Sequence, residues 1–161
     1  MTETDGFPGN SSDVPHESCG VIGVYLSTST ESDAARVAFF GLYALQHRGQ
    51  ESAGIAAADG RTLRNFTNVG LVSNAFHQED LDRLPGHLAI GHTRYSTTGS
   101  TGALNAQPIV SKSPTMELAL GHNGNVINAA ELRERLSEWG VTCTTGTDSE
   151  VIAHLLAWAP G

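Results

Sequence analysis

The stretch "CGVIGVY", residues 19–25, decides the fold. The residues that follow Cys19 are almost all apolar or glycine, which is typical of a mostly buried strand. The preceding residues, 1–18, are rich in Pro, Gly, Ser, Asp and Glu, and this composition predicts disorder. A thiol therefore stands at the junction between a leader and the first strand, and ordered structure is expected to begin there.

Length and charge restrict the class of protein. The chain has 161 residues, enough for about one domain, and its formal net charge of −8 disfavours a nucleic-acid partner. No apolar run approaches the ~20 residues of a membrane span, and the acidic N-terminus lacks the basic and apolar regions of a secretory signal. We therefore expect a cytoplasmic protein with no membrane partner, in which Cys19 and Cys143 are free thiols.

A helix and a hairpin are expected after the first strand. Apolar spacing predicts a helix over residues 31–49. Its expected inner face consists of Val37, Phe40, Gly41, Ala44 and Leu45. Two strand-like runs flank Asp59-Gly60, which is a hairpin signal, and residues 78–84 predict a short helix.

In the second half of the chain, a predicted strand followed by a polar loop occurs twice, at 87–100 and at 116–126. The sequence after these loops predicts helices at 128–140 and 147–159. Expected caps and capping-box partners are Asn128 with Glu131 and Thr147 with Glu150. Expected inner faces are Leu132, Leu136 and Trp139 in the first helix, and Val151, Ile152, Leu155 and Leu156 in the second. Paired strands with helices before and after predict an α+β layered fold with a largely antiparallel sheet.

Cys19 has two interpretations. A free cysteine is often a small buried hydrophobe. Alternatively, removal of residues 1–18 makes Cys19 the N-terminal residue, with an α-amino group whose pKa of about 7.7–8.0 lets it take the thiol proton. A nucleophile paired with its own N-terminal amine is a known catalytic arrangement.

Further positions could complete a site around such a nucleophile. "GHNGN", residues 121–125, could form an oxyanion hole from the Asn123 amide and the Gly124 backbone N–H, although Asn-Gly turns without function are common. Arg94 follows a strand and suits recognition of a carboxylate, or it is a solvated surface residue. Asp148 begins a helix, where it could bind an amine or only stabilise the helix dipole.

The seven histidines show no zinc-ligand spacing, so no metal site is expected in this chain.

Five blocks of the sequence together resemble the N-terminal glutaminase domain of the amidophosphoribosyltransferases. They are "CGVIGVY" (19–25), "LYALQHRGQESAGIA" (42–56), "GHTRYSTTG" (91–99), "GHNGNVINAAELR" (121–133) and "GTDSEVIAHLL" (146–156). The "LQHRGQES" segment looks specific to this family, because glucosamine-phosphate synthases carry a different version. The resemblance implies an N-terminal-nucleophile hydrolase fold, a four-layer αββα sandwich of two antiparallel sheets.

The resemblance also implies a domain division. Residues 1–18 would be a propeptide that is removed autocatalytically between Ser18 and Cys19. Residues 19–161 would be a class II glutamine amidotransferase domain, truncated at its C-terminus.

Carried over by motif, the resemblance implies a role for each candidate site residue. Cys19 would attack the side-chain amide of glutamine, and Asn123 with the backbone of Gly124 would hold the oxyanion. Arg94 would bind the α-carboxylate of the substrate and Asp148 its α-amino group.

Three more residues complete the implied site. Thr97 would line the glutamine pocket. Arg48 and Tyr95 would belong to loops that order the site when the second substrate binds.

In this family, ammonia from glutamine passes to a C-terminal phosphoribosyltransferase domain. That domain converts phosphoribosylpyrophosphate to 5-phosphoribosylamine, the first step of de novo purine synthesis. It uses Mg²⁺, some members carry a 4Fe-4S cluster, and the full-length enzyme would be a homo-oligomer, a tetramer. No cofactor is expected in this chain. The alternatives are another class II glutamine amidotransferase, or an inactive truncated fragment.

Overall fold

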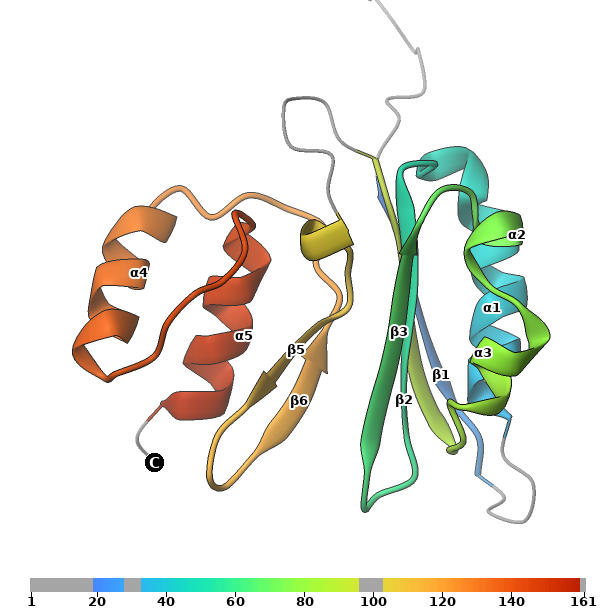
Figure 1. Cartoon of the computed structure of the whole chain (residues 1–161), viewed down its shortest axis with the longest axis horizontal. Coiled ribbons are helices and arrows are strands. Elements are labelled where there is room, and N and C mark those ends of the chain that lie inside the picture. Colours follow the sequence, from blue (N-terminus) through green and yellow to red (C-terminus); the bar gives the residue numbers. More distant parts are fainter. Residues whose placement is uncertain (1–18, 28–32, 96–102, 160–161) are drawn as a thin grey trace, which may run out of the picture.

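The computed structural model describes residues 19–27, 33–95 and 103–159. These residues form four layers in the order helices, sheet, sheet, helices, as Figure 1 shows from right to left. Paired strands in all the described sheets are antiparallel. The predicted layered α+β arrangement is therefore confirmed.

The larger sheet has the strand order β1-β4-β2-β3. Its strands are β1 (Gly20–Tyr25), β2 (Ser52–Ala58), β3 (Leu63–Val69) and β4 (Leu88–Arg94). The register sets Gly20 opposite Thr93 and Ser52 opposite Arg94. Because the strands pair antiparallel, the first residues of β1 and β2 and the last residues of β4 lie at the same end of the sheet.

The predicted hairpin between β2 and β3 is confirmed. Asp59 accepts hydrogen bonds from the backbone N–H groups of Arg61 and Thr62, and Gly60 has a φ of +89°, which a residue with a side chain rarely adopts. The local sequence was sufficient here because the turn depends on these four residues alone.

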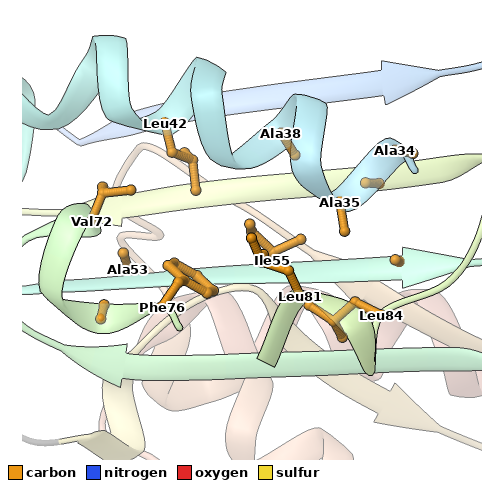
Figure 2. Packing of buried hydrophobic residues seen from close by; sticks show 13 residues of the cluster. Ala34, Ala35, Ala38, Leu42, Ala53, Ile55, Val72, Phe76, Leu81 and Leu84 are labelled. Carbon is orange, nitrogen blue, oxygen red and sulfur yellow. The ribbon is translucent and has the colours of Figure 1, made fainter. Parts of the chain in front are cut away.

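Three helices cover the outer face of the larger sheet (Figure 1). They are α1 (Ala34–Leu45), α2 (Val72–Ala75) and α3 (Gln78–Asp82), and a 3₁₀ turn η1 (Gln46–Arg48) follows α1. Figure 2 shows Leu42 and Ala38 of α1 above Ile55 of β2, with Phe76 and Leu81 closing the same cluster. This apolar cluster fixes the helices to the sheet.

The prediction of which face of α1 is buried was wrong. Val37 is 47% exposed and Phe40 is 68% exposed, whereas Ala34, Ala35, Ala38 and Leu42 are fully buried. A Cβ added at Gly41 would lie 1.9 Å from Ile22 Cδ1, so helix and sheet are in close contact there. Small residues permit this approach, and apolar periodicity could not identify them because almost every residue of α1 is apolar.

The smaller sheet pairs β5 (Ile109–Lys112) with β6 (Glu117–Leu120), after a 3₁₀ turn η2 (Ala103–Asn105). Helices α4 (Ala129–Glu138) and α5 (Asp148–Trp158) form the last layer, with α5 next to this sheet (Figure 1). A second buried cluster joins Leu136, Val141 and Val151, with Leu132, Cys143, Leu155 and Trp158 packed against it.

Both helices exist, but details of their ends and faces differ from prediction. Thr147 caps α5 as expected, since its side chain accepts a hydrogen bond from the N–H of Ser149. Asn128 makes no side-chain capping hydrogen bond, so the capping box predicted with Glu131 is wrong. Leu156, expected to face inward, is 56% exposed, because α5 buries its other side against β5 and β6.

Glu150 organises the loop that enters α5. Its carboxylate accepts four hydrogen bonds of 2.7–2.9 Å, from the backbone N–H and the hydroxyl groups of Thr144 and Thr145. Arg133 and His154 lie 3.7 and 3.6 Å from its oxygens. Glu150 therefore faces this loop instead of the N-cap of α5, so the expected capping box with Thr147 is not formed.

No helix within the described ranges is long and apolar enough to cross a lipid bilayer.

We predict that Leu42→Ala lowers the free energy of unfolding by about 2–5 kcal/mol, because it leaves a cavity between α1 and the sheet. Val37→Ala is the matched control on the same helix and should change stability by less than about 0.5 kcal/mol. Urea unfolding followed by circular dichroism measures both. Equal losses for the two variants would contradict the burial of the Leu42 face.

We predict that Glu150→Gln destabilises the protein by about 1–3 kcal/mol at pH 7, because an amide group would face N–H donors that need an acceptor. Burial alone raises the pKa of Glu150, but the hydrogen bonds from Thr144 and Thr145 outweigh it and hold the pKa below its usual value.

The stabilisation from Glu150 is therefore complete above the unfolded pKa of about 4.3 and is lost as the pH falls through the lower folded pKa. Melting curves of wild type and variant should converge over that range. Glu134→Gln, on the exposed side of α4, is the control and should melt like wild type at every pH. A constant difference between Glu150→Gln and wild type down to acidic pH would contradict this role.

Candidate active site

Cys19 lies at the edge of the larger sheet, directly before β1. The N–H of Gly20 donates a 3.2 Å hydrogen bond to the hydroxyl of Thr93, which ties the start of β1 to the end of β4. The Cys19 sulfur is partly exposed, and the backbone N–H of Tyr95 donates to it at 3.4 Å. The sulfur also lies 3.7 Å from the carbonyl oxygen of Tyr95. Strand pairing therefore presents the thiol at the surface next to an N–H donor.

Asn123 lies against Cys19, although the two residues are 104 positions apart in the sequence. Its side-chain Nδ2 donates a 2.7 Å hydrogen bond to the carbonyl oxygen of Cys19. Its Oδ1 lies 3.0 Å from Nε2 of His92, a fully buried residue of β4. The predicted amide donor is thus held from both sides and placed beside the predicted nucleophile.

The turn that carries Asn123 is supported by further hydrogen bonds. Gln107 accepts from the backbone N–H of His122 at 2.7 Å and donates to the Ser149 hydroxyl at 3.1 Å. The His122 ring lies 3.2 Å from that same hydroxyl. A Cβ at Gly124 would come within 2.7 Å of the His122 ring, so a side chain at this position would force the ring to move.

Arg94 ends β4 and borders a polar cavity. Its Nη1 donates to the carbonyl oxygen of Asn105 at 3.3 Å and lies 3.9 Å from the carboxylate of Glu51. The side chains of Arg94 and Glu51 are each 17% exposed, so this ion pair is screened only in part. The guanidinium is therefore anchored at one end and faces the cavity with the other.

Asp148, the first residue of α5, borders the same cavity. Its Oδ2 accepts a 2.6 Å hydrogen bond from the backbone N–H of Val126, which fixes the loop after Asn123. The cavity has a volume of about 390 Å³. It is lined by Arg94, Asn105, Asn125, Val126, Ala129, Arg133, Gly146, Thr147 and Asp148. A basic and an acidic group facing one polar cavity can hold the two charged ends of a free amino acid.

A second cavity, of about 460 Å³, lies on the inner face of the larger sheet and reaches Ala119 of β6. Apart from Tyr25, only glycine and aliphatic side chains line it, so it offers little for binding a charged substrate.

The other predicted residues are placed less directly. Arg48 ends η1, and the following segment reaches the site because the N–H of Glu51 donates to the carbonyl of Arg94 at 3.0 Å. Tyr95 contacts the Cys19 sulfur through its backbone, a contact that the sequence did not indicate. Thr97 and Ser18 lie outside the described residues.

Sequence reasoning missed two members of the site, His92 and Glu51. His92 appears in the sequence only as one of seven histidines without metal spacing. It stands two residues before Arg94 in one strand, and side chains two apart share a face of the sheet. That alternation was the available signal. Glu51 has no local signal, because its pairing with Arg94 depends on the register of β2 and β4.

Within the described ranges, no three His, Cys, Asp or Glu side chains are close enough to hold a metal ion. The chain has two cysteines, and a 4Fe-4S cluster needs four thiolates, so this chain does not fit such a cluster.

Burial lowers the pKa of His92 to about 4, with the charge of Arg94 adding to the effect, although hydrogen bonds to Asn123 and the His122 carbonyl oppose the shift. The ring is therefore neutral at physiological pH. Burial also raises the pKa of the Cys143 thiol, and the Glu150 carboxylate raises it further. The raised pKa makes the Cys143 thiol less suited to act as a nucleophile.

Comparison with known proteins agrees with this geometry. A family model described as a glutamine amidotransferase domain matches residues 92–161. The chain is 51% identical over 161 residues to an amidophosphoribosyltransferase of Synechocystis sp., covering 98% of the chain and 32% of the relative. It is 47% identical over 138 residues to that of Methanocaldococcus jannaschii, covering 86% and 29%.

Solved structures give the same result. The glutamine phosphoribosylpyrophosphate amidotransferase of B. subtilis, complexed with ADP and GMP, matches with a TM-score of 0.74 and 39% identity over 88% of this chain and 30% of that one. A structure described as the allosteric regulatory enzyme of purine biosynthesis matches with a TM-score of 0.76 at the same identity. The chain spans about 30% of the length of these relatives.

Structural and sequence matches thus cover almost the whole described chain, and they confirm that its four layers are those of an N-terminal-nucleophile hydrolase fold. The chain is therefore similar over most of its length to a domain of amidophosphoribosyltransferases, and its residues 92–161 match a glutamine amidotransferase domain.

Proposed function

We propose that this chain is the glutaminase half of an amidophosphoribosyltransferase. It would hydrolyse glutamine to glutamate and ammonia through a thioester on Cys19. The ammonia would go to phosphoribosylpyrophosphate and give 5-phosphoribosylamine, the first step of de novo purine synthesis. The observation that supports this most directly is the 2.7 Å hydrogen bond between the Asn123 amide and Cys19, which joins a nucleophile to an oxyanion donor across 104 residues.

The nucleophile in this proposal is the thiol of an N-terminal Cys19. Once residues 1–18 are removed, its α-amino group has a pKa of about 7.7–8.0 and takes the thiol proton. The N–H of Tyr95, 3.4 Å from the sulfur, stabilises the negative charge that remains. The thiolate then attacks the side-chain carbonyl carbon of glutamine.

Asn123 and Gly124 would stabilise the tetrahedral intermediate. One hydrogen of Asn123 Nδ2 bonds the Cys19 carbonyl, and the other donates to the oxyanion together with the Gly124 N–H. The Cys19 ammonium returns its proton to the leaving nitrogen, and ammonia departs. Water, deprotonated by the same amine, then attacks the thioester and releases glutamate and the thiol.

Glutamine would be held through its α-substituents. Arg94 binds the α-carboxylate, because its guanidinium is fixed by Asn105 and Glu51 at the cavity wall. Asp148 binds the α-amino group, and its position depends on the N–H of Val126. Thr97 would also contribute to glutamine binding.

The second half of the reaction belongs to the full-length protein. There, phosphoribosylpyrophosphate and Mg²⁺ would bind to a phosphoribosyltransferase domain, and the protein would be cytoplasmic and assemble as a homotetramer. Arg48 and Tyr95 would order the glutamine site when that second substrate binds. The proximity of η1 to β4 supports such coupling, and the N–H of Glu51, three residues after η1, donates to the carbonyl of Arg94 at the end of β4.

The leader would be removed by the same thiol. Cys19 attacks the carbonyl of Ser18, the peptide nitrogen becomes the free α-amine, and water hydrolyses the resulting thioester to leave Ser18 with a carboxylate. As long as residues 1–18 stay attached, the Cys19 nitrogen is an amide and cannot accept the thiol proton.

We predict that Cys19→Ala, in the product of the full-length gene, abolishes glutamine-dependent synthesis of phosphoribosylamine and leaves ammonia-dependent synthesis largely intact. Its intact mass should retain residues 1–18, whereas the wild-type mass should lack them. Cys143→Ala is the control and should match wild type in activity and mass, because Cys143 packs in the second buried cluster. An active wild-type enzyme that keeps the leader would contradict the proposed mechanism.

We predict that Asp148→Asn raises the KM for glutamine by about 10- to 150-fold, the equivalent of one charged hydrogen bond. Ammonia use should not change. Glu131→Gln is the control, because Glu131 lies in the first turn of α4 as Asp148 does in α5.

Steady-state kinetics and melting curves together decide the role of Asp148. An unchanged KM with a lower melting temperature would show that Asp148 serves only the helix, an effect worth up to about 1 kcal/mol.

A further inference from the structure

A buried histidine lies directly behind the amide of Asn123. His92 belongs to β4, where its register partners are Val21 of β1 and Gly54 of β2. The residue is fully buried. Its Nε2 is 3.0 Å from Asn123 Oδ1 and 3.3 Å from the carbonyl oxygen of His122. Both contacts are with the turn that carries the candidate oxyanion donor.

These contacts determine which ring nitrogen carries the hydrogen. Asn123 Nδ2 donates to the Cys19 carbonyl, which can only accept, so the oxygen of the same amide must face His92. Both partners of Nε2 are therefore acceptors, and Nε2 must be the donor. Nδ1 is buried and has no hydrogen-bond partner among the described residues, which suits an unprotonated nitrogen.

The neutral state of the ring agrees with this assignment. Burial in the sheet keeps the pKa of His92 at about 4, so one ring hydrogen is present at physiological pH and Nε2 holds it. The sulfur of Cys19 makes its hydrogen bonds with the backbone of Tyr95, so His92 acts on the site through Asn123.

We propose that His92 is a positioning residue, which holds the Asn123 carboxamide so that Nδ2 points toward the reacting carbonyl. An Asn side chain has an oxygen and a nitrogen of nearly equal size, and a half-turn would present the oxygen to the oxyanion instead. The Nε2–H donor of His92 favours one of these two orientations. This role rests on the proposed function of Asn123 and adds a residue to that function.

The first test compares side chains at position 92 in the product of the full-length gene, by glutaminase kinetics. His92→Leu removes the donor and should lower kcat by about 100- to 1,000-fold, as loss of an oxyanion donor does, with a KM for glutamine within about threefold of wild type. His92→Gln can place an N–H near the Nε2 position and should keep kcat within about tenfold of wild type.

His92→Asn is an independent variant for the case in which His92→Leu fails to fold. Its side-chain N–H lies near the Nδ1 position of histidine, so the kcat of His92→Asn should be well below that of His92→Gln. The matched control is His154→Gln, which alters a partly buried histidine that is hydrogen-bonded to Ser111 and lies 3.6 Å from Glu150. This control should retain wild-type kcat. Equal kcat values for His92→Gln and His92→Asn would overturn the proposal.

A double-mutant cycle separates positioning from general structural damage. If His92 acts through Asn123, the double variant His92→Leu/Asn123→Ala should be no slower than Asn123→Ala alone. Multiplied losses would overturn the proposal, as would a His92→Leu enzyme with wild-type kcat. The rate at which iodoacetamide alkylates Cys19 should be the same in all variants, because alkylation needs no oxyanion donor.

The same measurements distinguish failure of this inference from failure of the proposed function. A processed wild-type enzyme that does not hydrolyse glutamine would overturn the function itself. An active wild-type enzyme whose position-92 variants show additive or absent effects would overturn only the role of His92.

Discussion

The antiparallel pairing of β4 with both β1 and β2 is the constraint on which the candidate site depends. It sets Gly20 opposite Thr93 and Ser52 opposite Arg94, so Cys19, Glu51 and the end of β4 meet at one edge of the sheet. β4 and β2 are the inner strands of this sheet, and helices cover one of its faces. A shift of one residue in register would turn His92 and Arg94 to the opposite face and separate them from the cavity.

The second half of the site is held by side-chain hydrogen bonds rather than by strand pairing. The turn at 121–125 directly follows β6 and has no regular structure of its own. Its position depends on Gln107 and His92, which bond to residues 122 and 123, and on Asp148, which bonds to Val126. Glu150 in turn fixes the loop before α5 through Thr144 and Thr145. Catalytic groups need such support, because a donor displaced by about 1 Å loses much of its effect.

The sequence indicated candidate residues for the site, but not the contacts among them. Cys19, Asn123, Arg94 and Asp148 were recognised by residue type and motif, and the fold brings Cys19 to Asn123 and Arg94 to the same cavity as Asp148. The supporting contacts of His92 and Glu51 were not found. Each depends on which residues of distant segments lie opposite one another, and a single sequence does not contain that information.

By itself, the sequence determined the local features of this protein. The strand at 20–25, the Asp59-Gly60 turn and the Thr147 cap follow from residues close together in the chain, because their energies come from local backbone geometry and short-range hydrogen bonds. Only the tertiary structure decided which face of α1 is buried, since a helix that is apolar on every side has no preferred face until Gly41 meets Ile22. Tertiary structure likewise decided that Glu150 bonds the preceding loop and that His92 lies behind Asn123, because burial and strand register bring those partners together from distant parts of the chain.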